Sequence, residues 1–202
     1  MKKFGEIVTG YKIPVFNERE IRASAGILFF FATLSFYNAF LVQNFLFLKM
    51  FVIFFFIEFC IRLFVNPKYA PAMILGRIIV QNQKPEYTGA PQKYFAWVLG
   101  LCMATFMAIL LFVFNASGIV NLVVCSICLI LLFSETAFGI CIGCKMYEWI
   151  TKKKPQLCPG SVCEVVFKEE IQEVSRVQFG ILVLTFVVII GALFQFGVFG
   201  AL

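Results

Sequence analysis

The sequence contains no histidine in its 202 residues, and this absence excludes several kinds of chemistry. Bis-histidine haem, histidine-liganded zinc and Ser–His or Cys–His catalysis all need an imidazole, so we expect no haem in this chain. The sequence also lacks a Gly-x-x-x-x-Gly-Lys-Ser/Thr motif and a Rossmann fingerprint. Nucleotide-driven work would therefore need a partner protein.

Charged residues are scarce as well, at 14% of the chain, whereas hydrophobic residues make up 61% and phenylalanine occurs 27 times. The mean hydropathy is +0.94, so the chain has more apolar surface than a soluble domain of this size can bury. We therefore predict an all-α integral membrane protein whose partner is the lipid bilayer. Residues 1–202 are expected to form one membrane domain, with no separate soluble domain.

Five stretches are long enough for helices that cross a hydrocarbon core of about 30 Å. They predict a bundle of about five transmembrane helices, accompanied by interfacial amphipathic helices. Only the second stretch carries several charges, so its insertion should depend on its neighbours. The predicted spans are residues 23–43, 45–65, 95–114, 119–141 and 179–199, and the interfacial segments are 66–83 and 162–178.

Basic residues are distributed unevenly about these spans. All but one of the 17 Lys and Arg residues fall on one side of a five-span arrangement, the exception being Lys49. Because Lys and Arg favour cytoplasmic loops, we predict a multi-pass protein with a cytoplasmic N-terminus and a C-terminus on the opposite side. Attraction to lipid head groups then explains the formal charge of +6, and no nucleic-acid partner is expected.

Three separate blocks of the sequence resemble the signature blocks of a bacterial inner-membrane family of unknown function. The blocks read NEREIRASAG, NPKYAP and GICIGCKMY, and they begin at Asn17, Asn66 and Gly139. The resemblance implies a multi-span domain of the bacterial cytoplasmic (inner) membrane and no established activity. It also implies thioredoxin-like or sulfurtransferase proteins as partners.

A Cys-x-x-Cys motif, Cys141 and Cys144, stands at the predicted cytoplasmic end of the fourth span. Two thiols three residues apart on one helix share a face and suit redox exchange or sulfur transfer. We predict that they are the catalytic pair of a protein that handles thiols or sulfane sulfur. The negative end of the preceding helix should disfavour a thiolate at either residue. The alternative is that they only let helices pack closely beside Gly139 and Gly143.

Two further cysteines, Cys158 and Cys163, extend the motif to the pattern C-x2-C-x13-C-x4-C. This spacing lies within the range of zinc and iron–sulfur sites, so a metal-binding membrane module with Cys141 and Cys144 as its other ligands is a second hypothesis. Permanent disulfides are not expected on the cytoplasmic side, because that compartment is reducing.

Ionisable residues inside the predicted spans form a second constellation: Glu58, Arg62 and Glu135. A charge at the centre of a span costs about 2.5 to 3.5 kcal/mol, so each should face a partner or a water-filled pocket. Two arrangements follow: a substrate-binding pocket beside Cys141 and Cys144, or a clamp in which Arg62 bridges the two carboxylates. The charges also suit a permease or transporter subunit for a small sulfur-containing anion, which would work as a homo-oligomer because no internal repeat is evident. A scaffold without chemistry is the simplest alternative.

Overall fold

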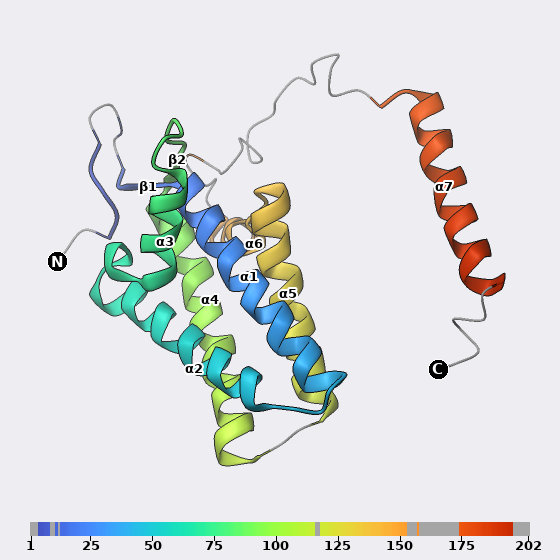
Figure 1. Ribbon diagram of the computed structural model, residues 1–202. Coiled ribbons are helices and arrows are strands. Elements are labelled where there is room, and N and C mark those ends of the chain that lie inside the picture. Colours follow the sequence, from blue (N-terminus) through green and yellow to red (C-terminus); the bar gives the residue numbers. More distant parts are fainter. Residues whose placement is uncertain are drawn as a thin grey trace. The chain divides into compact units, whose positions relative to one another are not determined.

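Helices make up nearly all of the regular structure in a computed structural model that describes residues 4–8, 11, 13–115, 118–152, 157 and 174–195. Contacts divide the chain into two units, Met1–Glu164 and Val165–Leu202. Four long helices run alongside one another in the first unit (Figure 1). They are α1 (Glu18–Phe40), α2 (Leu46–Cys60), α4 (Ala90–Ala108) and α5 (Ile119–Phe138), and π-helical turns η1 (Ile61–Val65) and η3 (Ile109–Val113) continue α2 and α4.

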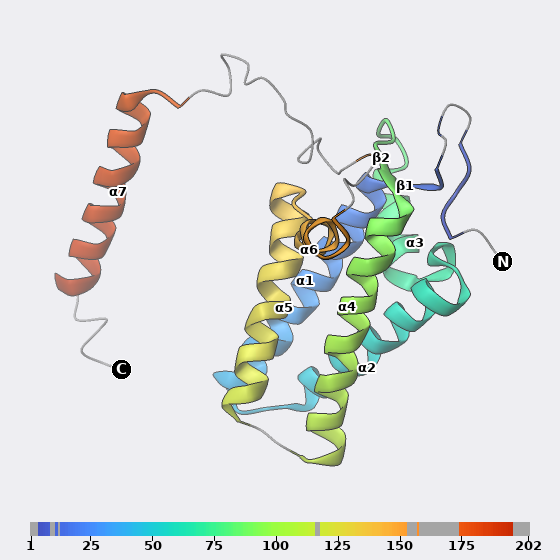
Figure 2. The same ribbon diagram turned by 180° about the vertical axis from the view of Figure 1, so that it is seen from behind.

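Short elements gather at one end of this bundle, as both views show (Figures 1 and 2). Two short strands pair antiparallel, with Val15 opposite Gly89, and so join the chain before α1 to the chain before α4. Helix α6 is seen nearly end-on in Figure 2, so it crosses the long helices steeply. These elements are β1 (Val15–Asn17), η2 (Pro67–Tyr69), α3 (Pro71–Val80), β2 (Tyr87–Gly89) and α6 (Ile142–Thr151).

Helix α1 shows how the sequence produces these elements. Asn17 caps it, since the side chain of Asn17 accepts a hydrogen bond from the N–H of Arg19 at 3.2 Å. Residues at helical spacing then form the buried face, on which small side chains let neighbouring helices approach. The apolar members of that face are Ile21, Ala25, Leu28, Ala32 and Ala39.

Three of the described helices are long and apolar enough to cross a membrane: Glu18–Phe40, Ala90–Val113 and Ile119–Phe138. Large apolar side chains such as Phe30 and Ile130 are exposed on their outer faces, as expected where lipid is the solvent. The predicted class, an all-α membrane protein, is therefore confirmed. The second unit contributes one described helix, α7 (Arg176–Gln195), whose first part is a shorter apolar segment.

The predicted fourth span, 119–141, ends earlier than expected. Helix α5 stops at Phe138 because Gly139 has a φ of +67°, a left-handed conformation that glycine adopts without steric cost. Its N–H donates to the carbonyl of Glu135 at 3.1 Å, which closes the helix. The guanidinium group of Arg22 lies against Gly139, where a Cβ would meet it at 3.1 Å. The chain then turns before α6, so the helix ends at Phe138 and not at Cys141 as the predicted span 119–141 does.

The interfacial segments are described unequally. In the predicted segment 66–83, helix α3 begins at Pro71 and ends at Val80, and Ile74, Leu75, Ile78 and Ile79 are exposed on it. Proline at the first helical position explains this start, because no intrahelical bond to its missing N–H is needed there. Of the segment 162–178, only residues 174–178 lie within the described part of the chain.

Candidate thiol site

The two cysteines of the motif begin helix α6. Cys141 is its N-cap residue, with φ −83° and ψ 99°, and the N–H of Cys144 donates to the carbonyl of Cys141 at 3.0 Å. Both side chains are buried, with 6% of Cys141 and 1% of Cys144 exposed. The positive end of a helix dipole favours a thiolate. The expectation of an unfavourable helix C-terminus is therefore wrong: the motif stands at a helix N-terminus.

The two thiols differ in their ease of ionisation. A hydrogen bond with Cys141, followed by burial, raises the pKa of the Cys144 thiol. A buried thiol that donates a hydrogen bond to a neighbouring sulfur gives up its proton reluctantly, because the charged form would lose both solvation and that bond. Cys144 therefore keeps its proton, and its thiol stays hydrogen-bonded to that of Cys141.

A close contact between α6 and α4 fixes the position of this pair. A Cβ added to Gly143 would lie 2.7 Å from the Cβ of Ala96, which is closer than two carbon atoms can pack. Gly143 thus allows the start of α6 to press against α4, as small residues do in membrane helix contacts. Lys93 lies one turn before Ala96 on α4, so this contact brings the thiols towards the lysine.

Lys93 is completely buried and joins three helices. Its Nζ atom lies 2.7 Å from Oε1 of Glu135 on α5 and 2.9 Å from Oε2 of Glu18 on α1. Lys93 also interacts electrostatically with Cys141 and Cys144. The buried ammonium group of Lys93 thus lies among two carboxylates and the two thiols of the motif.

Lys93 and Glu18 were not among the site residues predicted from the sequence. Lys93 had been counted with the loop charges, although it occupies the same helical face as Ala90, Trp97 and Ala104, all buried. That apolar stripe, at spacings of three, four and seven residues, was the available signal. Glu18 is an acidic residue in the first turn of α1, where a carboxylate is favourable whether exposed or buried, so the sequence carries no signal of its burial.

A second buried ion pair joins Glu58 to Arg62. Nε and Nη2 of Arg62 lie 2.9 and 2.7 Å from Oε1 of Glu58, and Nη2 also donates to the hydroxyl of Ser24. The other carboxylate oxygen of Glu58 accepts a hydrogen bond from the N–H of Ala72 at 3.0 Å. This network ties α1, η1 and α3 to α2, so the pair has a clear structural role.

The predicted clamp, in which Arg62 bridges Glu58 and Glu135, is wrong because Lys93 binds Glu135 instead. Arg62 and Glu135 nevertheless line one cavity of about 90 Å³, and Cys141 lines it with them. Glu58 is turned towards Arg62 and α3 and is not among the residues that line this cavity. Three of the residues predicted for the pocket, Arg62, Glu135 and Cys141, therefore line the same cavity.

Two of the four predicted metal ligands lie in the described part of the chain. Cys141 and Cys144 lie together, whereas Cys158 and Cys163 fall outside the described residues. Within the described ranges, no group of three or more His, Cys, Asp or Glu side chains is placed to hold a metal ion. The four-cysteine site therefore stays a prediction.

Apolar helices around a polar, ion-paired interior define this molecule as a helical membrane protein. Residues 16–152 match the family described as a domain of unknown function (DUF4395), and the chain belongs to that family. The predicted membership of a family of unknown function is thereby confirmed, and the matched range contains the three blocks that carried the resemblance. No curated protein and no solved structure matches the chain.

Proposed function

We propose that this protein handles thiols or sulfane sulfur at the cytoplasmic face of the bacterial inner membrane, with Cys141 as the attacking thiol and Cys144 as the resolving thiol. One observation carries the proposal: Cys141 lines the same small cavity as Arg62 and Glu135. Cys144 does not line that cavity, although its thiol is hydrogen-bonded to that of Cys141. A reactive sulfur therefore faces a space into which a small substrate fits, and a second sulfur stands behind it.

The surroundings of Cys141 support a nucleophilic role. Its sulfur stands at the N-terminus of α6, is hydrogen-bonded to Cys144 and interacts electrostatically with Lys93, and its thiolate is the proposed nucleophile. The thiolate attacks the outer sulfur of a persulfide, and the bond to the leaving thiolate breaks. The leaving thiolate takes up a proton, while Cys141 keeps the transferred sulfur as its own persulfide.

Cys144 completes the reaction. Sγ of Cys144 attacks Sγ of Cys141 and gives its proton to the outer sulfur, an intramolecular disulfide forms, and the outer sulfur leaves with that proton as hydrosulfide. The pair is then oxidised by two electrons, and a dithiol of the thioredoxin-like class, the partner proposed for this protein, restores it. Glu135 lines the same cavity as Cys141, and we assign to it the exchange of a proton with the leaving group.

The size of the cavity favours a small substrate. The cavity has a volume of about 90 Å³. The outer sulfur of a persulfide and a few atoms of its carrier fit this space, whereas a folded peptide does not. The buried charge of Arg62 is already shared with Glu58, which gives less support to a permease that carries anions past these charges.

The membrane arrangement is part of the proposal. Five spans require that α2 with η1, and α7, cross the bilayer together with the three long apolar helices. The Glu58–Arg62 pair lowers the cost of inserting α2, because each charge meets its partner inside the protein. A reporter fused after residue 202 that is active only outside the cytoplasm supports this arrangement, whereas a cytoplasmic signal contradicts it.

Mass spectrometry of the purified, reduced protein tests the chemistry. After treatment with an organic persulfide, we expect one added sulfur on Cys141 in the Cys144→Ser variant and a Cys141–Cys144 disulfide in the wild type. Cys102→Ser is the matched control, because Cys102 is an exposed thiol on α4 outside the cavity.

Three results would contradict or replace the proposal. An unmodified Cys141 in folded protein that reacts once unfolded would overturn it. Equal modification of the Cys141→Ser variant would mean that another cysteine reacts. Zinc or iron near one atom per chain, lost on Cys141→Ser, would favour the metal-binding alternative.

A further inference from the structure

A second cavity, of about 410 Å³, opens at the end of the bundle that carries the strands, and its lining residues differ from those of the thiol site. Segments far apart in the sequence line it: the chain before α1, the start of α1, the η2 turn and helix α3. Four charged side chains, Glu6, Glu20, Lys68 and Arg77, belong to this lining.

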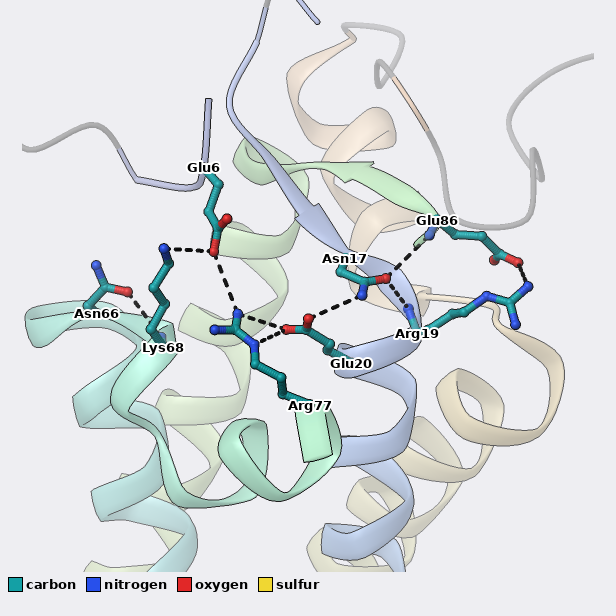
Figure 3. Close-up of polar contacts among 8 residues, drawn as sticks. All are labelled: Glu6, Asn17, Arg19, Glu20, Asn66, Lys68, Arg77 and Glu86. Atoms are coloured by element: carbon teal, nitrogen blue, oxygen red, sulfur yellow. Dashed lines mark hydrogen bonds and ion pairs between the residues drawn. The ribbon is translucent and has the colours of Figure 1, made fainter. Parts of the chain in front are cut away.

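The two cations of this cavity share one carboxylate. Nζ of Lys68 lies 3.0 Å and Nη2 of Arg77 lies 3.6 Å from the same oxygen, Oε1 of Glu6 (Figure 3). The three side chains are between 42% and 47% exposed, so solvent reaches this bridge. One anionic oxygen between an ammonium and a guanidinium group is the arrangement that a phosphate oxygen also adopts.

Local structure holds both cations in place. Asn66 caps the η2 turn by accepting a hydrogen bond from the N–H of Lys68 at 3.0 Å. On α3, a Cβ added to Gly76 would lie 2.6 Å from the carbonyl oxygen of Glu20, so α3 packs directly on the backbone of α1. This close approach sets Arg77 beside Glu20.

Glu20 fixes the orientation of the Arg77 guanidinium group. Its Oε2 atom accepts hydrogen bonds from Nε and Nη2 of Arg77 at 3.1 and 2.9 Å, and its Oε1 atom accepts one from Asn17 (Figure 3). The hydrogen bonds with Glu20 raise the pKa of Arg77, which therefore stays charged. The side chain is thus oriented for a ligand before one arrives.

Large apolar side chains are exposed near the two cations in the sequence. They are Phe64 and Val65 on η1, and Ile74 and Ile78 on α3, each within four residues of Lys68 or Arg77. Exposed apolar residues next to Lys and Arg mark the level of lipid head groups. The cations therefore stand where a phospholipid phosphate would lie.

We propose that Lys68 and Arg77 form a binding site for a phosphate group, which Glu6 occupies when no phosphate is bound. The backbone of Glu6 is tied to Val15 by two hydrogen bonds of 2.9 Å, so the side chain alone has to swing away. Lys68 and Arg77 then oppose only Glu20, which leaves a net charge of +1. This matches the single negative charge of a phosphodiester head group such as phosphatidylglycerol, and the exposed apolar side chains favour this lipid source over free phosphate.

Lipid titrations of the full chain in detergent, followed by native mass spectrometry, test the proposal. The probe is short-chain phosphatidylglycerol, and calorimetry with glycerol phosphate and inorganic phosphate forms a second arm. We expect Arg77→Gln and Lys68→Gln each to weaken lipid binding about tenfold, the loss of one charge-assisted hydrogen bond. Glu6→Gln should tighten binding, because it removes the competing carboxylate.

Lys84→Gln is the matched control, since Lys84 is exposed near the same end of the bundle but does not line the cavity. The affinity of the Lys84→Gln variant for phosphatidylglycerol should stay within about twofold of wild type. Binding of the lipid alone supports the head-group source, and binding of all three probes with the same variant pattern supports a free phosphate. A Lys84→Gln loss equal to that of Arg77→Gln, or unchanged affinity in Glu6→Gln, overturns the site. Tighter binding by Glu6→Gln cannot arise from misfolding.

Discussion

Nζ of Lys93 lies 2.7 Å from Oε1 of Glu135, and no part of the lysine side chain is exposed. Glu18 completes this group, so two carboxylates share one buried ammonium group and the formal charge of the three is −1. The group joins α1, α4 and α5 and lies within electrostatic reach of the cysteine pair. The same three side chains therefore tie the helices together and lie near the cysteine pair for which we propose thiol chemistry.

Removing the buried lysine should be strongly destabilising. Lys93→Met leaves the buried Glu18 and the partly buried Glu135 without their cation, and we expect a loss of about 3 to 5 kcal/mol in the free energy of unfolding. Adding Glu135→Gln should recover part of this loss, because it removes one unpaired charge. Denaturation in detergent measures both. The exposed Lys84→Met provides the control, and an equal loss there would refute the network's role.

The Glu58–Arg62 pair allows a comparison of buried with exposed ion pairs. Glu58→Gln leaves the buried Arg62 charge without its partner, and we expect a loss of about 3 to 5 kcal/mol. The matched variant is Glu86→Gln, whose partner Arg19 is partly exposed, and its cost should be about 0 to 1 kcal/mol. Similar losses of unfolding free energy for the two variants would show that burial does not determine how much the Glu58–Arg62 pair contributes to stability.

The contact between Gly143 and Ala96 can be tested by exchanging the two residues. Gly143→Ala should force α6 away from α4 and cost about 1 to 3 kcal/mol, because the added Cβ has no room. Ala96→Gly in the same chain should restore most of that loss by removing the opposing Cβ. Gly118→Ala is the control, since nothing lies within 4 Å of its added Cβ. Thermal unfolding and alkylation of Cys141 report both effects, and failure of the double variant to recover would contradict the contact.

The raised pKa of Cys144 predicts how stability depends on pH. Above the ordinary thiol value of 9.0, the unfolded chain loses this proton while the folded protein retains it, so folding is progressively weakened as the pH rises. The contribution of Cys144 to the free energy of unfolding is fully present below pH 9.0. Above that pH, the free energy of unfolding decreases by up to about 1.4 kcal/mol per pH unit. Unfolding at about pH 8 and about pH 10 should show a smaller decrease for Cys144→Ser than for wild type. Identical decreases would argue against a protonated, buried Cys144.

Local patterns predicted the regular structure well where they concern one helix at a time. The apolar stretches around Phe30, Phe106 and Ile130 lie on three helices that can cross a membrane, because the transfer of side chains into lipid is nearly additive along a segment. The end of α5 was misplaced, because the sequence pattern did not reveal the left-handed turn at Gly139. That single turn moved Cys141 from the end of one helix to the start of another.

Composition and residue spacing are enough to predict the class of this protein, its approximate helices and two cysteines near a helix end, since both act through local physics. Which charges meet is a property of the folded bundle: Arg62 binds Glu58 and Ser24, while Lys93 binds Glu135. The partner of a buried charge depends on the rotation and depth of helices distant in sequence. Those are set by close contacts such as Gly143 against Ala96, which no single segment encodes.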